Sequence, residues 1–133
     1  ALSSAASDVY KRQFLDRSNC PETNFFIGEV VSYPGKWSSF PPHTHVEPEI
    51  YFYKFLPENG YGYAEVGDTV YKVHHNDATC MAHGVTHSQA TAPGYAEYYI
   101  WAIRLRDNDP MVTTVVPEHA WVAEKDAKYF PEI

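Results

Sequence analysis

Four residues of the sequence have the types and the spacing of a metal site. In the segment PPHTHVEPEIYFYKF, His43 and His45 are two positions apart, so in an extended chain both imidazoles project from the same face. Glu49 is a further four positions on, and its carboxylate joins that face if the strand direction is kept. His87 follows the glycine of MAHGVTHSQ and is expected to open a strand that closes over the first three residues. The pattern predicts that the four side chains converge on one divalent ion.

The composition of this donor set favours a transition metal. Three imidazoles and one carboxylate suit zinc, iron, manganese, nickel or cobalt, whereas calcium and magnesium prefer more oxygen ligands. We expect zinc first, with manganese, iron or nickel as alternatives. A His-x-His pair alone occurs by chance, and exposed histidines usually bind nothing. The hypothesis therefore rests on the combination of the pair with a glutamate of the right parity and a later histidine on another strand.

The same alternation selects the side chains that would lie beside the ion. Counting from Glu49, Tyr51 and Tyr53 face the same way, and counting from His87, so does Gln89. We expect these three side chains to line a cavity, although buried tyrosines can equally be packed core residues. His83 precedes a glycine at the rim of the predicted site and is expected to contact a ligand.

The elements that position these residues are predicted to be short β-strands. From Asn24 onward, segments rich in Val, Ile, Tyr, Phe and Thr are separated by Gly, Pro, Asn or Asp, and no helical pattern of useful length competes. The spacing is typical of an antiparallel barrel or sandwich, hence an all-β fold. The predicted strands are Phe25 to Ser32, Glu49 to Phe55, Tyr61 to Val66, Thr69 to His74, Ala78 to Ala82, His87 to Thr91 and Ala96 to Leu105.

Length and charge restrict the partners. The chain has 133 residues, enough for one domain with its own core. Its net charge is −7 and it has no run of Lys or Arg, which argues against nucleic acid or an anionic membrane surface as a partner. No apolar stretch approaches the roughly 18 residues of a spanning helix, and the start does not resemble a secretion signal. We expect a cytoplasmic protein that binds a small molecule.

The first thirteen residues, ALSSAASDVYKRQ, show neither helical nor strand periodicity. The string from Ser4 to Gln13 also resembles translated adapter sequence, so it need not be native. We therefore expect residues 1–13 to be a polar tail and residues 14–133 to form the domain.

Several longer phrases carry a resemblance to a known family. NFFIGEVVSYPGKWSSFPPHTH, PEIYFYKF, GVTHSQATAPGY and AEYYIWAI resemble the 5-deoxy-glucuronate isomerase family of the cupin superfamily, over roughly Phe14 to Val122. The resemblance implies a single cupin domain, a jelly-roll-like antiparallel β-barrel. It also implies a metal site on His43, His45, Glu49 and His87. Proteins of this family are built from two cupin halves, and this chain matches the metal-bearing C-terminal half.

The activity that the resemblance implies is the interconversion of the aldehyde and keto forms of a deoxyuronic acid, such as 5-deoxy-glucuronate, in myo-inositol breakdown. Such an isomerase moves a proton between adjacent carbons while the metal polarises the carbonyl and the hydroxyl. Tyr51 and Tyr53 are the candidate acid or base groups, because a nearby cation can lower the pKa of a tyrosine below its usual value of about 10. For the substrate we expect contacts from Gln89, His83 and, for its carboxylate, Arg104.

Two other functions remain open. The same ligand set supports oxygen chemistry in other cupins, so a metal-dependent dioxygenase is the first alternative. A non-catalytic cupin that binds a sugar acid is the second. Ile50 and Phe52 point away from the predicted metal and give this strand an apolar outer face, from which we expect a homodimer.

Overall fold

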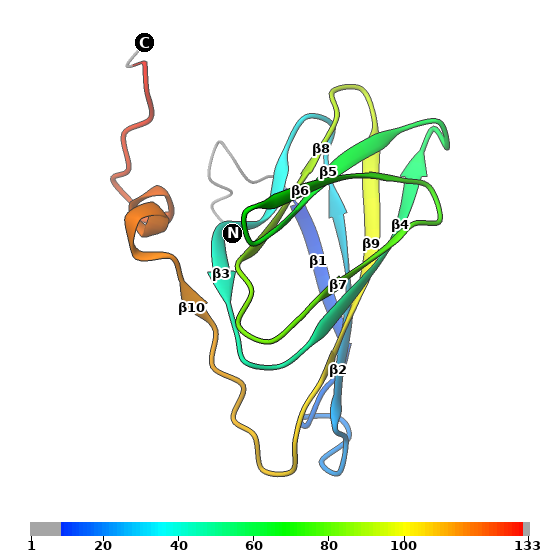
Figure 1. Ribbon diagram of the computed structural model, residues 1–133, viewed down its shortest axis with the longest axis vertical. Coiled ribbons are helices and arrows are strands. Elements are labelled where there is room, and N and C mark those ends of the chain that lie inside the picture. The colour runs from blue at the N-terminus through cyan, green and yellow to red at the C-terminus, as the bar shows by residue number, and fades with distance from the viewer. Residues whose placement is uncertain (1–8, 132–133) are drawn as a thin grey trace.

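The computed structural model describes residues 9–131, which form an almost entirely β structure (Figure 1). No helix within this range is long and apolar enough to cross a membrane. In chain order the elements are β1 (Val9–Leu15), β2 (Phe25–Ser32), β3 (Trp37–Thr44), β4 (Glu49–Leu56), β5 (Tyr61–Val66), β6 (Thr69–His74), β7 (Ala78–Met81), β8 (His87–Thr91), β9 (Ala96–Arg104), β10 (Thr114–Val115) and the 3-10 helix η1 (Pro117–Ala123).

The strands form two five-stranded antiparallel sheets. One sheet has the order β1-β2-β9-β4-β7 and the other has the order β10-β3-β8-β5-β6. Consecutive strands therefore often lie in different sheets, as β3 and β4 do, and the chain crosses repeatedly between the two layers. The two sheets enclose a common interior, which confirms the predicted all-β, barrel-like fold.

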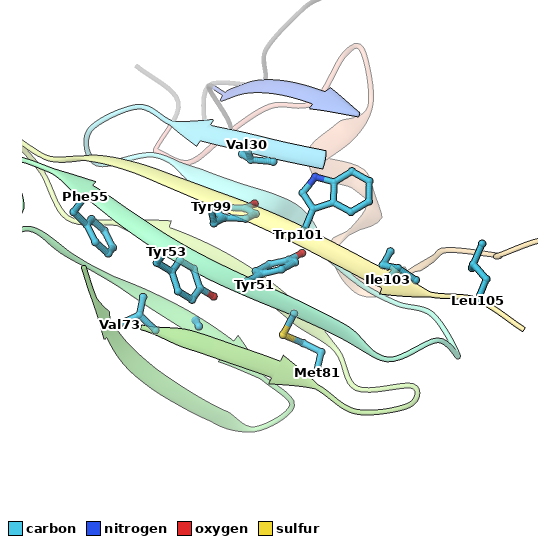
Figure 2. Packing of buried hydrophobic residues seen from close by; sticks show 11 residues of the cluster. Val30, Tyr51, Tyr53, Phe55, Val73, Met81, Tyr99, Trp101, Ile103 and Leu105 are labelled. Atoms are coloured by element: carbon cyan, nitrogen blue, oxygen red, sulfur yellow. The ribbon is translucent and has the colours of Figure 1, made fainter. Parts of the chain in front are cut away.

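The interior is filled by alternate residues of two paired central strands. In β4 the odd-numbered residues from Glu49 to Phe55 are buried, whereas Ile50 and Phe52 are exposed. In β9 the odd-numbered residues from Glu97 to Ile103 are buried in the same way. Figure 2 shows these aromatic side chains projecting from both strands into one space. The side-chain period of two explains why a tyrosine-rich sequence builds this core.

The core also requires a position without a side chain. Gly28 of β2 lies opposite Trp101 of β9. A Cβ atom at Gly28 would come within 2.4 Å of the Trp101 ring and within 2.6 Å of the Arg12 carbonyl. A side chain there would displace the indole, so glycine is needed for close packing rather than for an unusual backbone angle.

All seven predicted strands are observed, and four have the predicted bounds, namely β2, β5, β6 and β8. The sequence analysis did not predict β1, β3, β10 or η1. The prediction that residues 1–13 form a tail is wrong for residues 9–13, which belong to β1 and pair with β2. This edge strand exposes most of its side chains, so it has no hydrophobic alternation to detect. Residues 1–8 lie outside the described part of the chain.

Candidate metal centre

The predicted metal ligands come from three strands in both sheets. His43 lies on β3 and His45 directly follows that strand, while His87 begins β8 and pairs with His43 across the ladder. Glu49 begins β4 in the facing sheet. The four side chains therefore meet between the sheets, at the end where β3, β4 and β8 lie close together.

The four side chains converge as the spacing predicts. Ligand nitrogens of His43, His45 and His87 all lie within 4.8 Å of one another. Oε2 of Glu49 lies 3.0 Å from Nε2 of His45 and 3.2 Å from Nε2 of His87. One carboxylate and three imidazoles thus surround a single point.

Backbone carbonyls fix the orientation of all three imidazoles. Each ring has its Nδ1 near the carbonyl of a residue two positions away in the chain, which leaves Nε2 to face the cluster. The Nδ1-to-oxygen distances are 3.2 Å (His43 to Pro41), 2.9 Å (His45 to Glu47) and 3.0 Å (His87 to Val85). Such second contacts select the tautomer in which Nε2 is the ligand atom.

Burial and protonation indicate that the cluster fits a cation. His87, Glu49 and His45 are only 1%, 4% and 5% exposed. Nε2 of His87 lies 3.2 Å from Oε2 of Glu49 and has no hydrogen-bond partner among the described residues. An orphaned buried nitrogen is unfavourable unless an ion or a proton satisfies it. The donor set therefore fits a divalent transition-metal ion.

The charges within the cluster support the same conclusion. Burial opposes ionisation of Glu49, but its contacts with His45 and His87 outweigh that effect and lower the pKa of the carboxyl. Burial, reinforced by neighbouring His87, lowers the pKa of His43, so this imidazole stays neutral. The pKa of His45 is raised, because the contact with Glu49 outweighs the burial that opposes its charge. A metal ion would take the place of that proton.

The route by which Glu49 reaches the cluster differs from the predicted one. Parity along a continuous strand was expected to align it with His45. Instead the chain leaves β3 at Thr44 and enters the other sheet at Glu49. The carboxylate approaches from the opposite layer, so the cluster contains side chains from both sheets.

A cavity of about 330 Å³ opens beside the cluster. Its lining includes three of the ligands and Tyr51, as predicted, and also Ser38 and Ser39 of β3. The hydroxyl of Tyr51 lies 3.0 Å from Oγ of Ser39. This volume is within the range of pockets that hold small molecules.

Tyr53 and Gln89 face the interior but do not line this cavity. Both are fully buried, and the Tyr53 hydroxyl donates a hydrogen bond to Oε1 of Gln89 at 2.7 Å. Burial raises the pKa of Tyr53 and of Tyr51 above the usual value. Without an ion in the cluster both hydroxyls therefore keep their protons.

Arg104 and His83 lie away from the cavity as well. Both side chains are exposed, and Nδ1 of His83 is 2.6 Å from the Val46 carbonyl, a contact that ties two loops together. The cation on the cavity lining is Lys11 of β1, whose Nζ is 5.4 Å from the centre of the Trp101 ring. Sequence reasoning missed Lys11 because it lies in the segment treated as a tail.

Comparison with known proteins assigns the fold and the family. The model of the KduI/IolB family matches residues 8–122, which include the whole ligand cluster. The chain belongs to the KduI/IolB family. The resemblance to 5-deoxy-glucuronate isomerases seen in the sequence is thereby confirmed, with 27% identity over 128 residues to a curated 5-deoxy-glucuronate isomerase of Geobacillus thermodenitrificans.

Structural neighbours confirm the cupin-like barrel. An IolB-like protein of Salmonella typhimurium LT2 superposes with a TM-score of 0.83 at 23% identity, covering 92% of this chain and 51% of that protein. A cupin-like protein of Thermotoga maritima superposes with a TM-score of 0.66 at 18% identity, covering 90% of this chain and 87% of that one. The Geobacillus match covers 78% of this chain and 43% of the relative. The chain thus spans less than half the length of the curated relatives that it matches.

Proposed function

We propose that this KduI/IolB family chain carries the metal site of an aldose-ketose isomerase that acts on a deoxyuronic acid, such as 5-deoxy-glucuronate, in myo-inositol breakdown. The observation that carries the proposal is the largely buried cluster of three histidines and one glutamate beside a cavity lined in part by hydroxyl groups. The names of the curated relatives support the reaction class. We propose one divalent ion, with zinc first and manganese, iron or nickel as alternatives.

The proposed reaction moves a proton between adjacent carbons, so negative charge develops on the two oxygens that these carbons carry. When bound by His43, His45, Glu49 and His87, a divalent ion would supply Lewis-acid polarisation of those oxygens. The chain's own residues orient the substrate and exclude water. Tyr51, on the cavity lining, can accept a hydrogen bond from a substrate hydroxyl through its phenolic oxygen.

Removal of the metal is expected to abolish isomerisation reversibly. Protein treated with a chelator should show no conversion of 5-deoxy-glucuronate by proton NMR, and addition of one equivalent of zinc or manganese should restore it. Elemental analysis of the same samples relates activity to bound metal. Full turnover by metal-free protein would contradict the proposal.

The same samples separate the two alternative functions. Oxygen consumption that depends on added iron, without an isomerised product, would indicate a dioxygenase. Binding of the sugar acid without turnover by the metal-loaded protein would indicate a binding module. Isomerisation that is independent of oxygen is the expected result.

A homodimer and a cytoplasmic location stay predictions from the sequence. Ile50 and Phe52 are exposed on the outer face of β4, as the alternation predicts. We expect sedimentation equilibrium to give twice the mass of 15.2 kDa, and an Ile50→Glu, Phe52→Lys variant to give a monomer. A wild-type protein that sediments as a monomer would overturn this prediction.

A further inference from the structure

Two residues on the cavity lining hold a backbone conformation that few side chains adopt. Within residues 9–131, four residues other than glycine have a positive φ. Asn76 and Asn108 lie in exposed turns, where asparagine commonly takes this conformation. The other two, Ser39 with φ of 50° and Met111 with φ of 48°, both line the metal cavity. Strained backbone that gathers at a cavity indicates a functional constraint.

The conformation of Met111 has a local explanation. Its backbone N–H donates to Oδ1 of Asp109 at 2.9 Å, which closes a turn, and its side chain packs against the core cluster. Ser39 differs, because its conformation places a side-chain hydroxyl between two buried tyrosines. Its Oγ lies 3.0 Å from the hydroxyl of Tyr51 and 3.2 Å from that of Tyr99.

The direction of these hydrogen bonds can be assigned by counting protons. The Tyr99 hydroxyl donates its proton to Oγ of Ser38 at 3.0 Å. Ser39 must then donate its own proton to Tyr99 and accept from Tyr51. A serine oxygen can accept two hydrogen bonds, so these contacts leave one acceptor position on Ser39.

The position of Ser39 relative to the metal cluster suits a bound sugar. Ser39 is hydrogen-bonded to the hydroxyl of Tyr51. The centre of the Tyr51 ring lies 6.1 Å from the centre of the His87 ring. A ligand held at the cluster can therefore reach this wall of the cavity. An unused acceptor attracts a hydroxyl group and repels a carboxylate, so this wall favours the hydroxyl-bearing part of a ligand.

We infer that Ser39 is a substrate-binding residue that accepts a hydrogen bond from a hydroxyl of a polyhydroxylated substrate and so orients that substrate beside the metal cluster. This inference rests on the proposed function, because it concerns the same cavity and a sugar acid. It adds a recognition contact on β3 to the four metal ligands.

Two substitutions separate the hydroxyl from the backbone conformation. Ser39→Ala removes the hydroxyl and keeps a residue that is strained at positive φ, whereas Ser39→Gly removes the hydroxyl and relieves the strain. Zinc-loaded Ser39→Gly is expected to have the higher melting temperature of the two. Both variants are expected to lose about tenfold in kcat/KM for 5-deoxy-glucuronate, the worth of one hydrogen bond. Both should retain bound zinc.

Asn108→Gly is the matched control, since it makes the same backbone change in an exposed turn. It should keep the wild-type melting temperature and kcat/KM. Wild-type activity in Ser39→Gly, with a loss only in the less stable Ser39→Ala, would overturn the inference and assign Ser39 a structural role.

A binding measurement distinguishes failure of the inference from failure of the proposed function. Calorimetry with D-glucuronate and zinc-loaded protein should show about tenfold weaker binding to Ser39→Gly than to the wild type. If the wild type binds D-glucuronate but isomerises no sugar acid, the proposed function fails while this contrast still supports the contact. Equal affinities, or no binding by the wild type, would overturn the inference.

Discussion

The His87→Ala variant is expected to bind zinc at least about a hundredfold more weakly than the wild type and to lose isomerase turnover by about a thousandfold. His87 is 1% exposed, and its Nε2 faces Glu49 and two other imidazoles without a hydrogen-bond partner in the described structure. Lewis-acid polarisation contributes several kcal/mol to such a reaction, and about 4 kcal/mol corresponds to about a thousandfold in rate.

The measurements are elemental analysis after dialysis against a weak chelator and the NMR assay at saturating substrate. The second variant, His87→Gln, preserves more of the buried volume. It shows whether a loss of zinc binding in His87→Ala comes from misfolding or from the missing imidazole. His74→Ala is the matched control, because His74 is exposed and interacts only with Asp77, at 3.4 Å, among the ion pairs of the described residues. Wild-type metal content in both His87 variants would refute the assigned ligand set.

The Glu97→Gln variant is expected to be more stable than the wild type at neutral pH. Glu97 of β9 is fully buried, and neither of its carboxylate oxygens has a hydrogen-bond partner within the described residues. The carboxyl lies against Gly62, where a Cβ atom would come within 3.1 Å of Oε2. Burial raises the pKa of Glu97 from 4.5 to about 8, so the folded protein holds this carboxyl in its neutral form at pH 7.

The sign of the pH dependence follows from this shift. Between pH 4.5 and about 8 the folded state holds a proton on Glu97 that the unfolded state has lost. The stability of the wild type therefore decreases as the pH rises through this range, and it loses nothing more from this group above about pH 8. At pH 7 the shift corresponds to about 3 kcal/mol of lost stability. Glutamine does not ionise, so the unfolding free energy of the variant does not decrease with pH through this position.

Urea unfolding of the metal-free proteins at several pH values tests the prediction. The difference in unfolding free energy between Glu97→Gln and the wild type should be small near pH 4.5 and should grow to about 3 kcal/mol at pH 7. Glu97→Leu, which also removes the buried polar group, should show the same trend. The other ionisable groups are common to all three proteins and cancel in the comparison. A difference that does not change with pH would show that Glu97 is not a buried neutral acid.

Much of the candidate metal site was predictable from the sequence, because its donors obey local rules. Residues two positions apart on an extended chain have side chains on the same face, independently of the tertiary structure. This rule places His43 beside His45 and Tyr51 beside the cavity. The same rule puts Gln89 in the interior, but not in the cavity. Alternation predicts on which face of a strand a side chain lies. It does not predict how far along the strand the ligand-binding cavity extends.

The parts that were not predicted depend on contacts between distant segments. Glu49 reaches the cluster from the opposite sheet. The strand β1 forms from a polar stretch because β2 offers it an open edge. Ser39 takes a left-handed conformation between two tyrosines of other strands. None of these leaves a periodic pattern in the sequence. The types and spacing of its residues thus determined that this chain is a β-barrel with a cluster of histidines and a glutamate in its interior. Only the tertiary structure decided which sheet supplies the carboxylate and which hydroxyls line the cavity, because packing between the layers, rather than local backbone geometry, sets those positions.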